Sequence, residues 1–160
     1  MKKDYSDLFK SFIYAFKGIG WIVTHERNFR IHITCMAYMF YYLLVYDFFV
    51  VSRLEFAVLL LACSTVIGGE LINTGIEKSD DSVTKEQKET IRISKDTAAG
   101  AVLVFAIFAV ITGVVILFQP EAFNKLYLHY VNEPVYIVLF LLSVAAATLF
   151  IFKFDFKKKD

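Results

Sequence analysis

The sequence predicts an all-α membrane protein, in which an amphipathic helix at the N-terminus precedes several long apolar helices. Hydrophobic residues make up 58% of the 160 residues, against about 45–50% in ordinary soluble domains. Charged residues make up only 21%, and the mean hydropathy is +0.57. A soluble domain of this size has too little interior to bury so much apolar surface. The composition therefore favours a chain that is dissolved in a bilayer.

The N-terminal segment, residues 4–23, is expected to form the amphipathic helix. Its apolar side chains recur at the i, i+3, i+4 spacing of a one-sided helix, namely at Leu8, Phe9, Phe12, Ile13, Phe16, Ile19 and Val23. Lys10 and Lys17 fall on the other side. Such a helix is too polar to cross a bilayer and too apolar to stay in water, so we expect it to lie along the membrane surface. The alternative is a packing helix of a soluble domain.

Four apolar runs are expected to cross the membrane. They cover residues 31–51, 56–79, 97–118 and 134–152. Each is long enough to span a hydrocarbon core of about 30 Å at about 1.5 Å per residue. The short connection at residues 52–55 predicts that the first two spans form a hairpin.

The basic residues predict the orientation of these spans. All but two of the 17 Lys and Arg residues lie in the N-terminal segment, in residues 78–95 or in the tail after residue 152; the exceptions are Arg53 and Lys125. The positive-inside rule then places both termini and the 78–95 loop in the cytoplasm. With 16 acidic residues the net charge is only +1, so no overall field favours nucleic acid as a partner.

The second expected span carries an acidic stripe. At about 100° per residue, Glu70, Thr74, Glu77 and Asp81 lie within about 40° of one direction, and Asn73 lies about 60° to one side. An ionisable residue inside a membrane helix costs on the order of 3 kcal/mol to insert, so each needs a partner. Carboxylates and an amide are the oxygen ligands that Mg2+ takes, and Mg2+ commonly also binds substrate phosphates. The stripe thus predicts a site for a metal–nucleotide complex.

A structural role is the alternative, in which Glu70 and Glu77 pair with Lys95 or Arg30 and hold the helices together. Two flanking segments favour the site. Glu26 stands just before the first span, and Lys95 and Asp96 are expected at the N-terminus of the third. Exposed amides, the positive end of the helix dipole and a lysine would there make a phosphate-binding corner. No GxxxxGK(S/T) motif occurs, which argues against a Walker-type NTPase.

At this point the sequence resembles a known family. The segment ELINTGIEKSDDSV, followed by KDTAAGAVLVFA, is similar to the prokaryotic diacylglycerol kinase and undecaprenol kinase family of small membrane enzymes. FKSFIYAFKGIGWIVTHERNF is similar to the family's N-terminal surface helix and to the glutamate before its first span. The resemblance covers residues 5–117. It implies a lipid kinase domain at residues 1–118 with a three-helix transmembrane core, and an added part at residues 119–160 made of an extracellular loop, a fourth transmembrane helix and a basic cytoplasmic tail.

The resemblance also implies an activity and a set of roles. The family transfers the γ-phosphoryl group of ATP to the hydroxyl of a membrane lipid, uses Mg2+, and forms homotrimers whose sites are shared between neighbouring chains. By resemblance Glu70 is the catalytic base that meets the lipid hydroxyl, Glu26 and Glu77 bind the metal, and Asn73 and Asp81 support the site. The residues that it implies for ATP binding are Tyr14, Glu26, Glu77, Glu86, Lys88, Lys95 and Asp96. The family often has His where Lys88 stands.

THERNF and NTGIE resemble the Gram-positive branch of the family, which favours undecaprenol over diacylglycerol as the lipid and a bacterial cytoplasmic membrane as the location. Two other readings stay open. In one, the acidic stripe is the path of an ion-coupled transporter. In the other, the protein is a non-catalytic relative of the kinases that acts as an accessory protein.

Overall fold

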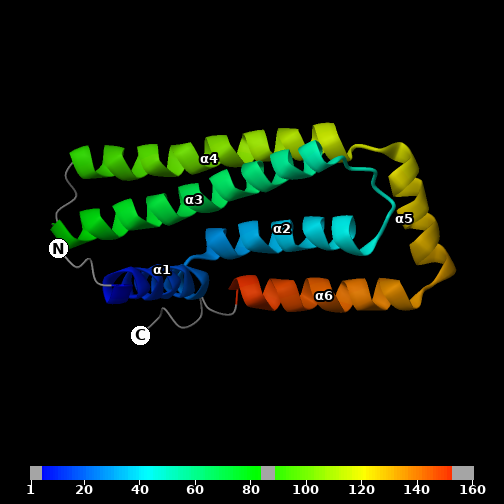
Figure 1. The fold of residues 1–160 in the computed structure, drawn as a ribbon, viewed down its shortest axis with the longest axis horizontal. Helices are drawn as coiled ribbons and strands as arrows, with labels where there is room; N and C mark the ends of the chain where they lie inside the picture. The colour runs from blue at the N-terminus through cyan, green and yellow to red at the C-terminus, as the bar shows by residue number, and fades with distance from the viewer. Residues whose placement is uncertain (1–4, 84–88, 153–160) are drawn as a thin grey trace.

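The computed structural model describes residues 5–83 and 89–152. Within these residues it contains α-helices and no strand (Figure 1). The helices are α1 (Tyr5–His25), α2 (Arg27–Val45), α3 (Arg53–Val83), α4 (Glu89–Leu117), α5 (Pro120–Asn132) and α6 (Val135–Phe152). This confirms the all-α fold class.

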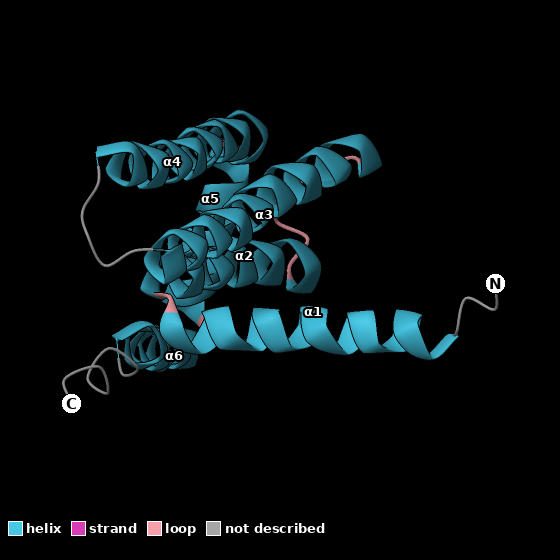
Figure 2. Cartoon of the chain, turned by 90° about the vertical axis from the view of Figure 1, so that its left-hand side faces the viewer, coloured by secondary structure: helices cyan, strands magenta, loops and turns pink. Residues whose placement is uncertain are grey.

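Four of the helices form an elongated bundle, and the other two lie at its ends. Helices α2, α3, α4 and α6 run roughly along the long axis, and α5 closes one end between α4 and α6 (Figure 1). Helix α1 crosses the opposite end nearly at right angles to the bundle (Figure 2). The end of α3, the start of α4 and the end of α6 lie at the same end of the bundle as α1. That α1 lies along a membrane surface, and that the chain crosses the membrane an even number of times, stay predictions.

Three of the described helices are long and apolar enough to cross a membrane: α3, α4 and α6. Helix α2 was expected as a fourth crossing over residues 31–51, but it does not reach that level of hydropathy and it ends at Val45. The reason is its first turns, which carry Arg27, Arg30 and His32. Its 19 residues still make a rod of about 28 Å, which packs between α3 and α6.

The predicted turn at residues 52–55 is wrong, because the connection is residues 46–52 and α3 has already begun at Arg53. The cause is a reciprocal cap. The Ser52 backbone N–H donates to Glu55 Oε2 (2.8 Å), and the Glu55 N–H donates to Ser52 Oγ (3.2 Å). This capping box satisfies two amides that a helix start would leave unpaired.

Helix α4 begins at Glu89, two turns before the expected start of the third span. Arg92 bridges Glu89 (2.6 Å) and Asp96 (3.1 Å) along one face, at the i, i+3 and i, i+4 spacings that stabilise helices. Lys95 and Asp96 therefore lie inside a helix. The expected phosphate-binding corner of free amides at these two residues is wrong.

Residues 119–133 were expected as a loop, and most of them form α5. Pro120 stands in its first turn, where a fixed φ and a missing N–H favour helix initiation. Helix α6 follows almost at once, and its bounds match the last expected span. None of the α6 residues is buried in the chain, as suits a helix that faces lipid.

The closest helix pairing is α3 against α4, and it depends on Gly69. A Cβ atom at Gly69 would lie 2.8 Å from Cδ2 of Phe105 on α4, whereas one at Gly68 would meet nothing within 4 Å. Gly69 thus lies where α4 packs closely on α3, directly beside Glu70. The small buried core near it includes Leu59, Val66 and Val102.

This geometry predicts opposite effects for two neighbouring substitutions. Gly69→Ala should lower the unfolding temperature in detergent, because overpacking against Phe105 costs about 1–3 kcal/mol. Gly68→Ala is the matched control, and it should leave the temperature equal or higher, because alanine favours helix by about 1 kcal/mol over glycine. Adding Phe105→Leu should restore the Gly69→Ala protein. Equal unfolding temperatures for the two single variants would contradict the packing.

Candidate active site

The centre of the site is Glu70, a carboxylate buried in the middle of α3. Only 4% of Glu70 is exposed, and Thr74, one turn further along the same face, is also buried. The nearest charged or titratable partner is His32 of α2, whose Nε2 lies 3.3 Å from Glu70 Oε1. Among the described residues Lys95 pairs with Asp81 instead, so the alternative pair of Glu70 with Lys95 does not form. A buried carboxylate beside an imidazole can accept a proton from a substrate group that reaches it.

His32 was not among the residues that the sequence predicted for the site. A signal was present, because His32 is an ionisable residue inside the first expected span, and such residues are functional candidates by default. Its partner was not visible, because only the packing of α2 on α3 brings His32 to Glu70.

Asn73 and Glu77, about one and two turns beyond Glu70, form the next part of the stripe. Asn73 Nδ2 donates to Glu77 Oε1 at 2.9 Å. Asn73 Oδ1 is buried and, among the residues described, has no hydrogen-bond partner. Buried amide oxygens are nearly always satisfied in folded proteins. An unsatisfied Oδ1 beside a carboxylate has the donor chemistry of a hard-cation site such as one for Mg2+.

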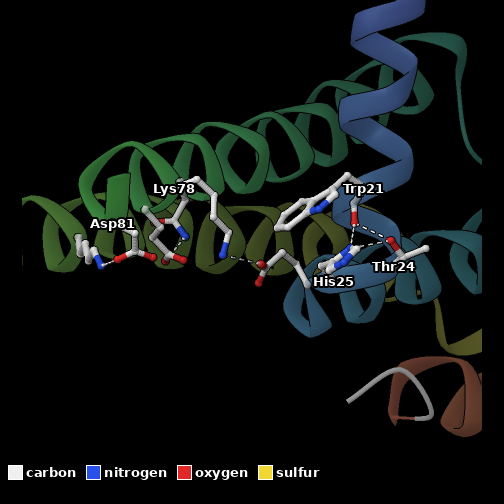
Figure 3. Close-up of polar contacts among 9 residues, drawn as sticks. Trp21, Thr24, His25, Lys78 and Asp81 are labelled. Atoms are coloured by element: carbon white, nitrogen blue, oxygen red, sulfur yellow. Dashed lines mark hydrogen bonds and ion pairs between the residues drawn. The ribbon is translucent and has the colours of Figure 1, made fainter. Parts of the chain in front are cut away.

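Glu26 reaches the stripe from the junction of α1 and α2. It is the N-cap of α2, with extended backbone (φ −110°, ψ 114°), and its Oε1 lies 3.9 Å from Lys78 Nζ of α3. Lys78 also lies 5.2 Å from the centre of the Trp21 ring on α1. Lys78 thus connects both sides of the junction to the helix that carries Glu70 and Glu77 (Figure 3).

The end of α1 is held in a defined shape before this junction. The His25 ring stacks on Trp21 at 4.3 Å, and His25 Nδ1 lies 2.8 Å from both Thr24 Oγ1 and the Trp21 carbonyl oxygen. Figure 3 shows these three residues together, on the α1 side of Lys78. These contacts hold the last turn of α1 directly before Glu26.

At the surface end of the stripe, Asp81 of α3 forms an ion pair with Lys95 of α4. Asp96 lies next to Lys95 and pairs with Arg92. The structure therefore brings the expected Lys95 to the stripe through Asp81. Lys95 offers an ammonium group to the site, without the free backbone amides that were expected beside it.

The remaining predicted residues are less close to this set. Tyr14 is exposed on α1, and Lys17 of the same helix lies 5.8 Å from its ring centre. Glu86 and Lys88 lie outside the described residues. Across residues 5–83 and 89–152, no three Asp, Glu, His or Cys side chains converge closely enough to hold a metal ion. A single described chain thus provides suitable oxygen donors at Glu26, Asn73 and Glu77 but not a completed metal site.

The comparisons with known proteins indicate one family. Residues 13–117 match the family model of the prokaryotic diacylglycerol kinases. An undecaprenol kinase of Bacillus subtilis is 34% identical over 121 residues, which cover 75% of this chain and 94% of that protein. A diacylglycerol kinase of Synechocystis is 39% identical over 116 residues, which cover 71% of this chain and 64% of that protein. No solved structure matches.

The contact between Glu70 and His32 predicts an energetic coupling. In a double-mutant cycle of Glu70→Gln and His32→Gln, the two effects on stability should be non-additive by about 1 kcal/mol, because each variant removes the partner of the other. Unfolding in detergent measures this value. Glu70→Gln combined with His129→Gln, at the far end of the bundle, is the control and should be additive. Additivity in both cycles would contradict the contact.

Proposed function

Because the chain belongs to the prokaryotic diacylglycerol kinase family of membrane lipid kinases, we propose that it transfers the γ-phosphoryl group of ATP to the hydroxyl of undecaprenol, giving undecaprenyl phosphate and ADP. The observation that carries this proposal is the buried Glu70 carboxylate inside a membrane-crossing helix, with a polar stripe leading from it to the bundle end. A hydrophilic substrate has no reason to meet its base at this depth. A lipid hydroxyl arrives there from the bilayer.

The choice of undecaprenol rests on the relatives. The undecaprenol kinase of Bacillus subtilis aligns over 94% of its length, which includes the motifs on which the site depends. Diacylglycerol is the second candidate lipid, and it is supported by the 39% identity to the diacylglycerol kinase of Synechocystis, over 64% of that protein. An ion-coupled transporter has no such support, because both relatives are named as kinases.

In the proposed reaction Glu70 takes the proton of the lipid hydroxyl as that oxygen attacks the γ-phosphorus, and the bond from the γ-phosphorus to the ADP oxygen breaks. His32, 3.3 Å from Oε1, fixes the orientation of the Glu70 carboxylate on the α2 side. Phosphoryl transfer consists mostly of positioning and neutralisation of charge. The burial of Glu70 serves that end, because it keeps water from competing with the lipid hydroxyl.

Glu26 and Glu77 are proposed to bind Mg2+, with the unsatisfied Asn73 Oδ1 as a further oxygen donor. A bound Mg2+ would supply positive charge that offsets the charge of the ATP phosphates. Lys78 and Asn73 hold the two carboxylates in place before the metal arrives. Lys95 and Asp96 are proposed to border the phosphates, and Tyr14, Glu86 and Lys88 the rest of the nucleotide. Asp81 holds the Lys95 ammonium at the stripe.

A homotrimer in the bacterial cytoplasmic membrane is the proposed assembly, with both termini and the 78–95 segment in the cytoplasm. Two observations support it. The donors of one described chain do not converge into a complete metal site, which leaves room for donors from a neighbouring chain. The basic residues of α1, of the start of α2, of the end of α3 and of the start of α4 belong to elements that lie at one end of the bundle.

The reaction can be tested with labelled ATP and the full-length protein in nanodiscs that contain either undecaprenol or diacylglycerol. We expect Mg2+-dependent phosphorylation of undecaprenol, and less of diacylglycerol, because the alignment covers nearly all of the undecaprenol kinase. Thin-layer chromatography of the extracted lipids measures both products. Phosphorylation of diacylglycerol alone would transfer the proposal to the second candidate, and no labelled lipid in either case would overturn it.

The roles of the two central glutamates predict a loss of turnover without a loss of structure. Glu70→Gln and Glu77→Gln should each lower kcat by at least about 100-fold, because they remove the general base and a metal ligand. Both proteins should still insert and elute at the wild-type size in detergent. Glu121→Gln, an exposed residue of α5 at the far end, is the matched control and should keep full activity. Turnover near the wild-type value in either glutamine variant would refute its role.

A further inference from the structure

Arg30, in the first turns of α2, is fully buried and joins two helix ends that are far apart in the sequence. Its Nε and Nη2 donate to the carbonyl oxygen of Ile151 at 3.0 and 2.8 Å. Its Nη1 donates to the carbonyl oxygen of Val23 at 3.3 Å. Val23 lies in the last turn of α1, and Ile151 lies in the last turn of α6.

These acceptors suit an arginine. The last carbonyl groups of a helix have no partner within the helix, and they carry its partial negative charge. A guanidinium group offers donors in a planar fork, so one side chain can bind two such ends at once. Arg27 adds a second contact to α6, with its guanidinium 6.0 Å from the centre of the Phe152 ring.

Further along α6, part of the space between it and α2 is open. A cavity of about 840 Å³ separates the two helices and is lined mostly by apolar and tyrosine side chains. Among the described residues, the side-chain hydrogen bonds across this space are Tyr38 to Ser143 (2.9 Å) and, from α5, Tyr130 with Tyr42. The bonds of Arg30 to Ile151, together with the contact of Arg27 with Phe152, attach α6 at the end of the bundle where Glu26 lies.

Arg30 contacts the chain on both sides of Glu26, so its attachment to α6 bears on the position of Glu26. Glu26 is the non-helical residue between α1 and α2, three residues after Val23 and four before Arg30. The Arg30 side chain donates to the Val23 carbonyl oxygen. Residues 23 and 30, on either side of Glu26, are thereby held together. The backbone N–H of Arg30 also donates to the Glu26 carbonyl oxygen (3.3 Å). A change in the place of Arg30 moves the direction in which Glu26 faces α3.

We propose that Arg30 is a positioning residue for Glu26, and that α6 holds it in place through the Ile151 carbonyl group. The inference rests on the proposed function, in which Glu26 binds the metal. It assigns a role to residues 119–160, which lie beyond the region that the family model matches. Helix α6 is then part of the catalytic unit of this chain, although it contributes no side chain to the reacting groups.

Arg30→Lys tests the proposal, because lysine keeps the charge but has no planar fork to bind two carbonyl groups. We expect the Mg2+ concentration for half-maximal activity to rise about tenfold, the usual effect of losing a group that orients a metal ligand. At saturating Mg2+, kcat should recover most of its wild-type value. Arg53→Lys, the same exchange at the start of α3 at the other end of the bundle, is the matched control and should not change the Mg2+ dependence.

A chain that ends after Gln119 should show the same shift in Mg2+ dependence as Arg30→Lys, and the two changes combined should add little to either alone. A truncated chain with wild-type kcat and Mg2+ dependence would overturn the proposal, as would an Arg30→Lys protein with the wild-type Mg2+ dependence. If one of the two variants does not fold, the other still decides.

A second measurement reads the contact without kinase activity. In a chain with Cys35→Ser and Cys63→Ser, the pair Arg27→Cys and Phe152→Cys should be joined by a short bismaleimide, and adding Arg30→Lys should reduce the yield severalfold. Efficient cross-linking in a protein that phosphorylates no lipid would leave the attachment intact and refute the proposed function. An unchanged yield with Arg30→Lys would refute the attachment.

Discussion

The burial of the Glu70 carboxylate within a membrane-crossing helix is the constraint on which the rest of the structure depends. A charged group at that depth is costly unless a partner reaches it, and the partner comes from another helix, as His32 of α2. Helix α2 therefore has to pack against α3 at this level, although its own first turns are too polar for it to count as a membrane span. The polar start of α2 and the acidic second half of α3 therefore depend on each other. Each lowers the cost of placing the other in a bilayer.

Further along α3, towards the end of the bundle, the other polar and charged residues also have partners. These partners come from α3 itself, from the α1–α2 junction and from α4. Asn73 binds Glu77 within the helix, Lys78 meets Glu26 from the α1–α2 junction, and Asp81 meets Lys95 of α4. Three helices are thus held to one acidic face by polar contacts. Gly69 allows α4 to approach beside this face. These pairs also fix the orientation of the carboxylates along this face.

The sequence could predict the elements whose signal is periodic, and it could not predict those whose signal is a single contact. The amphipathic α1, the acidic stripe and the bounds of α6 follow from patterns of many residues, and the structure confirms them. The start of α3 depends on one capping box at Ser52 and Glu55, and the early start of α4 on one arginine between two acids. The apolar composition of residues 31–51 predicted one continuous span, and it gave no signal that α2 ends at Val45. His32 was visible as a residue, but its partner depends on helix packing.

Helix α6 shows how an added element can become part of an existing site. Its side chains are not buried in the chain and face lipid, so hydrophobic packing alone gives it no specific place on the bundle. What gives it one is the unpaired carbonyl end that every helix has, here bound by Arg30 together with the end of α1. Since a buried guanidinium needs acceptors, and two helix ends need donors, the three groups satisfy one another. The junction that presents Glu26 is their common neighbour, and for that reason the last helix of the chain bears on the first residues of the site.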